Sequence, residues 1–276
     1  MRVYISVDME GIAGISHPDP TRRGDDGYPA AVELMVGEAN AAVEGAFDGG
    51  ADEVVVNDSH GSMFNLTPAA MDSRARLVQG QKPLSMVEGA ADGAFDVALF
   101  VGYHARAGHP RGTLAHTQSG AQTLTAIGDQ PVGEYGLNAL YLGALGVPVG
   151  LVTGDDALAE EVAAFLPWAE RAVVKRAVGR SAADSLHPTV ARDLIRHAAR
   201  RAVERAAAGD ASLEPLRPPP PIRVSIGFDH AGRADLAALM PPLRREGDRG
   251  VRFEAADGLT AYRLFVCAVR LGSLAP

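Results

Sequence analysis

Short runs of β-branched residues alternate with helical patterns along the first part of the chain. The runs lie at residues 3–7, 53–56, 97–101, 149–152 and 172–175, and the helical patterns at 30–47, 83–90, 134–145 and 157–165. Parallel strands need long crossover connections, which are usually helices, so this alternation is typical of a parallel sheet. It predicts an α/β fold with a mainly parallel sheet covered by helices.

One segment departs from this alternation before the helical pattern at residue 134. Thr123–Ile127 is followed by Gly128, Asp129, Gln130 and Pro131. Glycine and proline supply the backbone dihedrals of a turn, so the segment predicts a hairpin. We expect a small antiparallel insertion there.

The last third of the chain predicts a smaller α/β unit. A helix is expected from Thr189 to about Ala207, and prolines at 215 and 218–221 then favour an extended connector because proline fixes φ. Strand patterns follow at 222–226 and 251–255, with helical patterns at 233–240 and 259–271. The expected domains are residues 1–180 and residues 181–276, the second entered through the long helix and the connector.

The charge balance argues against a nucleic-acid partner. The 276 residues include 26 basic and 34 acidic side chains, for a formal net charge of −8. A nucleic-acid binder needs a basic surface that releases counterions from phosphates, and the basic face at Arg192, Arg196 and Arg200 is expected to be solvated. No run approaches the roughly 18 apolar residues of a membrane-spanning helix, so no membrane partner is expected.

Cytoplasm is the expected location. Residues 1–8 lack the basic region and the long apolar region of a signal peptide. Cys267 is the only cysteine, so an intrachain disulfide framework is excluded. It lies in an apolar helical pattern, which predicts a buried structural thiol rather than a nucleophile.

Four polar clusters each follow or end an apolar run. They contain Asp8 with Glu10, Asn57 to His60, Tyr103 with His104, and Glu134. The carboxyl ends of the strands in an open parallel sheet converge on one crevice, where ligands bind. These clusters are therefore expected to meet.

The chemistry of these clusters predicts a metal centre. Asp8 and Glu10 fall on one face of a continuing strand, where two carboxylates repel unless a cation lies between them. With His60, His104 and Glu134 they form a nitrogen and oxygen ligand set that suits zinc. Three carboxylates and two histidines exceed the needs of one hydrolytic zinc, so two zinc ions per chain are expected, bridged by Asp8.

Each residue taken alone also has a structural interpretation. Asp8 or Glu10 could be a strand-end acid paired with an arginine, and His60 could belong to a turn. His104 could be a satisfied core histidine, and Glu134 a first-turn acid favoured by the helix dipole. We favour the metal centre because all four features recur at successive strand ends.

Several segments resemble one known family. They are Ser6–Ile12, Val56–His60, Ser85–Gly89, Gly102–Ala107 and Pro131–Asn138, with further similarity at Gly154–Asp156, at Val174 and Lys175, and into the proline-rich connector. They resemble the zinc D-aminopeptidases associated with bacterial dipeptide-permease operons, over nearly the whole chain. The resemblance implies an α/β fold in two domains, a di-zinc site at the five positions above, and a homo-oligomer, a ring-shaped decamer, whose central channel limits access.

The resemblance also assigns a catalytic histidine to His116. A histidine beside a metal-bound water can move protons or, when charged, stabilise an oxyanion. His109 is the alternative, and the segment 107–112 is one residue longer than the family pattern. Lys175 and Arg106 are candidates for contact with substrate or with a neighbouring subunit.

The expected reaction is hydrolysis of the N-terminal peptide bond of short peptides, with a metal-bridging hydroxide as nucleophile. The resemblance implies that these peptides contain D-amino acids. A two-metal phosphoesterase remains an alternative, because paired ions also clamp a phosphoryl group during displacement. A second alternative is a metal-dependent peptide-binding protein without turnover. The sequence contains neither a P-loop nor a dinucleotide-binding fingerprint.

Overall fold

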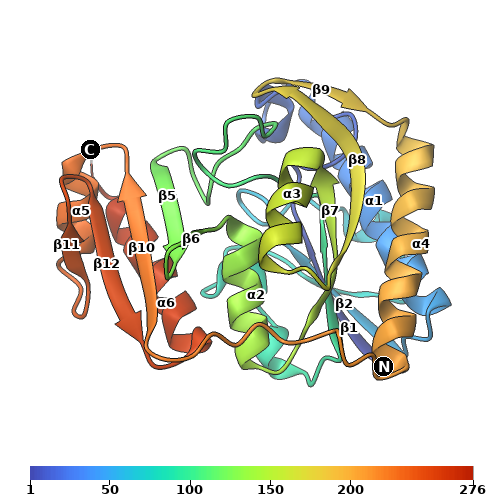
Figure 1. Cartoon of the computed structure of the whole chain (residues 1–276). Helices are drawn as coiled ribbons and strands as arrows, with labels where there is room; N and C mark the ends of the chain where they lie inside the picture. Colours follow the sequence, from blue (N-terminus) through green and yellow to red (C-terminus); the bar gives the residue numbers. More distant parts are fainter. Residues whose placement is uncertain (276) are drawn as a thin grey trace.

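Seven strands form the larger of two sheets in this computed structural model, which describes residues 1–275 (Figure 1). Their order across the sheet is β3-β2-β1-β4-β7-β8-β9. The bounds are β1 (Arg2–Val7), β2 (Glu53–Asp58), β3 (Arg76–Val78), β4 (Val97–Val101), β7 (Val149–Asp155), β8 (Glu170–Gly179) and β9 (Ala182–Ser185). Every neighbouring pair is parallel except β8 with β9. The predicted α/β fold with a mainly parallel sheet is confirmed.

Helices cover both faces of this sheet. They are α1 (Tyr28–Asp48) and α4 (Pro188–Ala207) on one face, and α2 (Glu134–Ala144) and α3 (Asp156–Phe165) on the other. Successive residues of β1 point to opposite faces, so Val3 and Ile5 share a core with α1 and α4, whereas Tyr4 shares one with α2. Gly45 lets α1 and α4 approach closely, because a Cβ there would lie 2.2 Å from the carbonyl oxygen of Arg196.

Five antiparallel strands form the second sheet, on the left of Figure 1, in the order β11-β12-β10-β5-β6. The bounds are β5 (Gln122–Ile127), β6 (Gln130–Pro131), β10 (Ile222–Phe228), β11 (Arg244–Glu246) and β12 (Gly250–Ala255). Two helices, α5 (Ala231–Ala237) and α6 (Gly258–Gly272), pack against β10 and β12. The predicted hairpin is present as β5 and β6, and β5 also pairs with β10.

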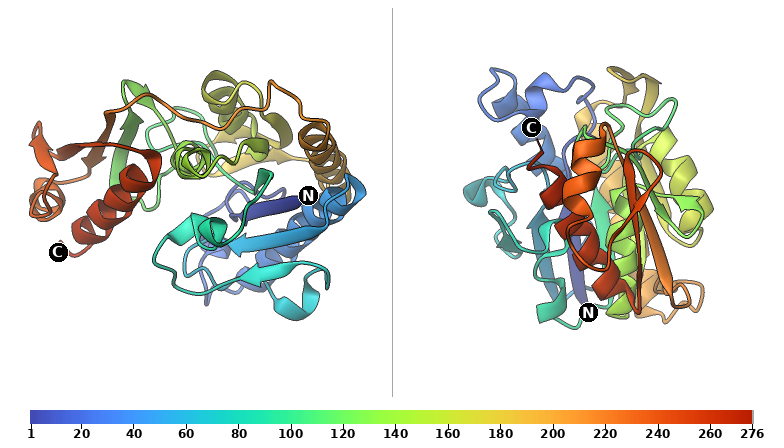
Figure 2. Two further views of the ribbon diagram at one scale, coloured as in Figure 1. Left: turned by 90° about the horizontal axis from the view of Figure 1, so that it is seen from below. Right: turned by 90° about the vertical axis from the view of Figure 1, so that its left-hand side faces the viewer.

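The predicted division at residue 180 stays a prediction, and the two sheets do not follow it. β5 and β6 precede this position but belong to the smaller sheet, whereas β9 and α4 follow it and pack with the larger sheet. After α4 the proline-rich connector runs along the lower edge of Figure 1 to β10. Figure 2 shows the smaller sheet and its helices to one side of the larger sheet.

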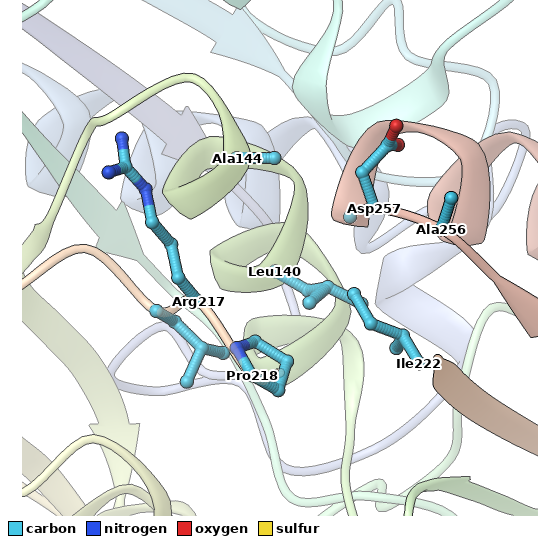
Figure 3. A pocket seen from close by; sticks show the side chains of 9 residues that line it. Leu140, Ala144, Arg217, Pro218, Ile222, Ala256 and Asp257 are labelled. Atoms are coloured by element: carbon cyan, nitrogen blue, oxygen red, sulfur yellow. The ribbon is translucent and has the colours of Figure 1, made fainter. Parts of the chain in front are cut away.

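Helix α6 joins the two parts by packing against α2. The Tyr141 and Tyr262 rings have centroids 5.1 Å apart. A cavity of about 220 Å³ lies beside this contact, between α2, the connector and the start of α6 (Figure 3). In Figure 3, Leu140 of α2 and Ile222 of β10 line it together with Arg217 of the connector.

Residues 83–90 do not form the predicted helix. They contain η3 (Ser85–Val87) and the start of η4 (Ala90–Asp92), two short 3-10 turns like η1 (Asp19–Thr21) and η2 (Pro68–Ala70). Ser85 and Gly89 have φ angles of 55° and 79°, in the left-handed region. A right-handed helix cannot pass through such residues, so the apolar spacing was a misleading signal.

The prediction of a buried thiol at Cys267 is also wrong, because this residue is exposed. Its neighbours Val266 and Ala268 are buried, as are Tyr262 and Phe265. The buried residues of α6 form one stripe, and Cys267 falls outside it.

None of the helices in residues 1–275 combines the length and the apolar character that a membrane span requires.

Candidate metal centre

The predicted ligands meet at one edge of the larger sheet. Asp8 directly follows β1, His60 lies two residues beyond β2, and His104 lies three residues beyond β4. These three strands are parallel neighbours, so their carboxyl ends open at the same edge. Glu134, the first residue of α2, reaches the same cluster.

His60 and His104 each lie between two carboxylates. His60 Nδ1 is 2.9 Å from Glu10 Oε2 and 3.2 Å from Asp8 Oδ1. His104 Nε2 is 3.3 Å from Asp8 Oδ2 and 3.4 Å from Glu134 Oε2. Asp8 thus presents one oxygen to each histidine. The structure brings all five predicted residues together, and their assignment as metal ligands stays a prediction.

A backbone carbonyl orients each of these imidazoles. His60 Nε2 lies 2.8 Å from the carbonyl oxygen of Thr21, and His104 Nδ1 lies 3.0 Å from that of Ala105. In the neutral ring these nitrogens donate to the carbonyls, so the nitrogen that faces the carboxylates carries the lone pair. Metal-binding histidines typically have this arrangement, because the second hydrogen bond fixes both tautomer and ring orientation.

Burial and charge in the cluster favour positive charge among its carboxylates. Burial opposes the charged form of Glu10, but His60 outweighs it and holds the pKa of Glu10 well below its usual value. Burial also opposes charge on His104, but Glu134 and Asp8 raise the pKa of His104 well above its usual value. The carboxylates therefore stabilise positive charge placed among them.

Two buried polar atoms of the cluster lack a hydrogen bond within residues 1–275. They are Glu10 Oε2 and His104 Nε2. His60 Nδ1 lies close to Glu10 Oε2, but the angles do not make a hydrogen bond. Buried polar atoms without partners cost free energy, and a metal ion bound to them would remove that cost.

The donor atoms form two overlapping groups that could hold metal ions. One group contains Asp8, Glu10 and His104, and the other contains His104, His116 and Glu134. Within each group the donor atoms lie within 4.8 Å of one another. Imidazole and carboxylate donors without a thiolate match the preference of hydrolytic zinc, so these residues fit a zinc centre.

His116 lies beside the cluster, and His109 does not. The His116 and His104 rings are stacked with centroids 4.1 Å apart and an interplanar angle of 11°. His116 Nδ1 lies 2.8 Å from the carbonyl oxygen of Leu114, which leaves Nε2 for the cavity of about 140 Å³ above the cluster. His109 Nδ1 instead accepts a hydrogen bond of 3.0 Å from the backbone amide of Gly112. The catalytic role of His116 stays a prediction.

Lys175 is buried and contacts the metal-ligand segment, which is the stretch after β1 that contains Asp8 and Glu10. Its Nζ donates to the carbonyl oxygen of Glu10, to that of Ile12 at 3.0 Å and to that of Ile15 at 2.6 Å. The ammonium group therefore closes the turn that follows β1. Sequence reasoning considered only substrate or subunit contacts for Lys175, because a lysine near a strand end has no pattern that predicts burial.

Two further contacts involve Glu134 and the nearby Arg106. The backbone amide of Gln118 donates to Glu134 Oε1 at 2.5 Å. Sequence reasoning missed this contact because a backbone amide carries no residue signal. Arg106 lies against Glu161, with Nε and Oε1 3.4 Å apart, so its charge is paired within the chain.

Comparison with known proteins gives one consistent result. The sequence profile of a peptidase family described as D-aminopeptidase matches residues 1–267. The chain is 39% identical to the D-aminopeptidase of Bacillus subtilis (strain 168) over 273 residues, which cover 98% of this chain and 97% of that protein. Among solved structures it is similar to the zinc-dependent D-aminopeptidase DppA from Bacillus subtilis, described as a self-compartmentalizing protease. The TM-score is 0.92 at 38% identity, over 99% of this chain and 98% of that chain. The chain therefore belongs to the D-aminopeptidase family of peptidases.

Proposed function

We propose that this chain is a zinc-dependent aminopeptidase that removes the N-terminal residue of short peptides, including peptides of D-amino acids. The observation that carries the proposal is the buried cluster in which His60 and His104 each face two carboxylates. Membership of the peptidase family supports the reaction class. The names of the Bacillus relatives support both zinc and D-peptides. The phosphoesterase and the non-catalytic binding protein have no comparable support.

Two zinc ions per chain are proposed, held by Asp8, Glu10, His60, His104 and Glu134. Asp8 is the proposed bridge, because its Oδ1 faces His60 and its Oδ2 faces His104. His60 faces Asp8 and Glu10, whereas His104 faces Asp8 and Glu134, and these two sets share only Asp8, which supports a second ion. Three carboxylates also supply the negative charge needed to hold two divalent cations close together.

Bound zinc would polarise the scissile carbonyl and lower the pKa of water to about 7. Residues of the chain would bind the substrate, move protons and stabilise the oxyanion. Asp8, Glu10 and Glu134 line the cavity together with His60, so the N-terminal end of the substrate would enter beside the ligand residues. The free Nε2 of His116 would move a proton or stabilise the developing oxyanion. The stacked His104 and the Leu114 carbonyl fix the orientation of the His116 ring.

We propose that the protein is a homo-oligomer, and more specifically a ring-shaped decamer. The description of DppA as self-compartmentalizing supports assembly. The cytoplasmic location stays a prediction.

Metal analysis combined with a small substrate panel tests the proposal. The pure protein is assayed with D-Ala-D-Ala, L-Ala-L-Ala and p-nitrophenyl phosphate, before and after chelation and zinc addition. We expect zinc-dependent release of D-alanine from D-Ala-D-Ala and no release of p-nitrophenol. Zinc-dependent phosphate ester hydrolysis without peptide hydrolysis would contradict the proposal.

A further inference from the structure

A larger cavity adjoins the cavity over the metal-ligand cluster. It measures about 580 Å³, against about 140 Å³ for the cavity at the cluster. We call it the adjoining groove, and it is lined by Gly61, Ser62, Met63, Gln81, Lys82, Pro83, Ser85, Gln118 and Arg270. Three of these residues, Gly61, Met63 and Gln118, also line the smaller cavity. A ligand larger than the smaller cavity therefore extends into the groove, whose volume is typical of small-molecule sites.

The adjoining groove has two cationic side chains and no acidic one. Lys82 and Arg270 line it, and none of its lining residues is Asp or Glu. Arg270 comes from α6 and donates to the Lys82 carbonyl oxygen at 2.8 Å, so the smaller sheet unit helps to build the groove. The cluster beside the groove contains three carboxylates, Asp8, Glu10 and Glu134, all of which are proposed zinc ligands, so the groove is the part of the combined cavity that offers cationic side chains.

Lys82 is buried without a carboxylate partner. Lys82 is only 6% exposed, and its Nζ donates to the backbone carbonyl of Asp58. Burial lowers the pKa of Lys82 to about 8, since Asp58 and Glu88 offset the loss of solvation only in part. Within residues 1–275 neither Lys82 nor Arg270 forms an ion pair with an acid. A buried cation of this kind is stabilised by an anionic ligand.

Backbone strain is concentrated around the same groove. Four residues other than glycine in residues 1–275 have a positive φ, and three of them line the groove: Met63 at 58°, Ser85 at 55° and Gln118 at 60°. The fourth is Leu114 at 54°, whose carbonyl contacts His116. Left-handed backbone costs free energy in residues with a Cβ and clusters at ligand-binding sites.

We propose that the adjoining groove binds the C-terminal carboxylate of the peptide substrate, with Arg270 and Lys82 as its cationic partners. This inference rests on the proposed peptidase function and specifies its substrate class. The metal-ligand cluster receives the N-terminal end of the peptide, and the basic groove beside it receives the carboxylate. One extended residue spans about 3.3–3.6 Å, so only peptides of few residues place both ends correctly. The enzyme thereby selects short peptides with a free carboxylate.

The test compares D-Ala-D-Ala with its C-terminal amide, which removes the negative charge and little else. For the zinc-loaded wild-type protein we expect kcat/KM for the free acid to exceed that for the amide by about 10- to 100-fold, the effect of a hydrogen bond to a charged group. Arg270→Gln should reduce kcat/KM for the free acid by a similar factor and leave the amide unchanged. Arg270→Lys should retain part of the preference, because it keeps the charge.

Arg263→Gln is the matched control. Arg263 lies on α6 two turns before Arg270, is exposed and does not line the groove. Arg263→Gln should leave kcat/KM unchanged for both the free acid and the amide. Equal use of acid and amide by the wild-type protein would overturn the inference. An equal loss on both substrates in Arg270→Gln would also overturn it, because that result indicates a structural role.

A binding measurement separates this inference from the peptidase proposal. The probe is a D-Ala-D-Ala analogue with its peptide carbonyl replaced by CH2, titrated calorimetrically as acid and as amide into the zinc-loaded protein. The acid should bind more tightly to wild type, and the preference should disappear in Arg270→Gln. If the protein hydrolyses no peptide but still binds the acid more tightly than the amide, the peptidase proposal is refuted and carboxylate binding in the groove is supported. Hydrolysis without any preference for the acid would refute the groove alone.

Discussion

Replacement of Lys175 by methionine tests whether the metal-ligand segment depends on one buried ammonium group. Methionine fills a similar volume but leaves the carbonyl oxygens of Glu10, Ile12 and Ile15 without their shared donor. The Ile12 oxygen keeps a hydrogen bond from the Ile15 amide, so two carbonyls are left unsatisfied, each at a cost of about 1–3 kcal/mol. Part of this loss is offset, because burial of the ammonium is itself unfavourable and lowers the pKa of Lys175 to about 8. We expect Lys175→Met to lower the free energy of unfolding by about 2–4 kcal/mol.

The measurement is urea unfolding of the metal-free protein, with zinc affinity determined separately by competition with a chelator. The Glu10 carbonyl is one of the three acceptors, so the loosened turn should also weaken zinc binding by about 10- to 100-fold. Arg176→Ala is the control. Arg176 is the residue after Lys175 on β8, and its ion pair with Asp184 is exposed. That pair should contribute less than about 1 kcal/mol. A Lys175→Met protein as stable as Arg176→Ala, with unchanged zinc affinity, would refute the reasoning.

Further predictions concern the histidines and a buried acid. His116→Ala should retain its zinc and lose about 10²- to 10⁴-fold in kcat, measured by metal analysis and steady-state kinetics. His104→Ala should instead lose zinc affinity, and equal zinc loss in both variants would show that His116 is a ligand. Burial raises the pKa of Glu38 to about 7. The unfolded carboxyl therefore loses its proton first, and stability should fall as pH rises from about 4.5 to 7. Glu38→Gln should reduce this fall in unfolding experiments across that range, whereas the exposed Glu33→Gln should not.

The sequence was sufficient for the parts of the site that depend on strand ends. Asp8, His60 and His104 each follow an apolar run, and the parallel arrangement of those runs requires their ends to converge. The residue types at these strand ends therefore predict the cluster from the sequence alone. The bonds that orient these side chains go to backbone carbonyls such as those of Thr21 and Ala105, which no residue pattern reveals.

Contacts between distant segments were beyond the reach of sequence patterns. β5 pairs with β10, about a hundred residues later, so its sheet could not be assigned from the hairpin alone. Arg270 and Lys82 meet only because α6 packs across α2 and reaches the loop before η3. The predicted helix at 83–90 failed for a local reason, since Ser85 takes a left-handed φ that apolar spacing does not indicate.

The most direct test of the central claim is a crystal structure of the zinc-loaded protein with anomalous data collected on both sides of the zinc absorption edge. We predict two zinc peaks per chain, about 3.5–4 Å apart, with one oxygen of Asp8 directed to each ion. His60 and Glu10 should contact one ion, and His104 and Glu134 the other. A single peak in fully active protein, or two peaks that Asp8 does not join, would contradict the two-metal centre.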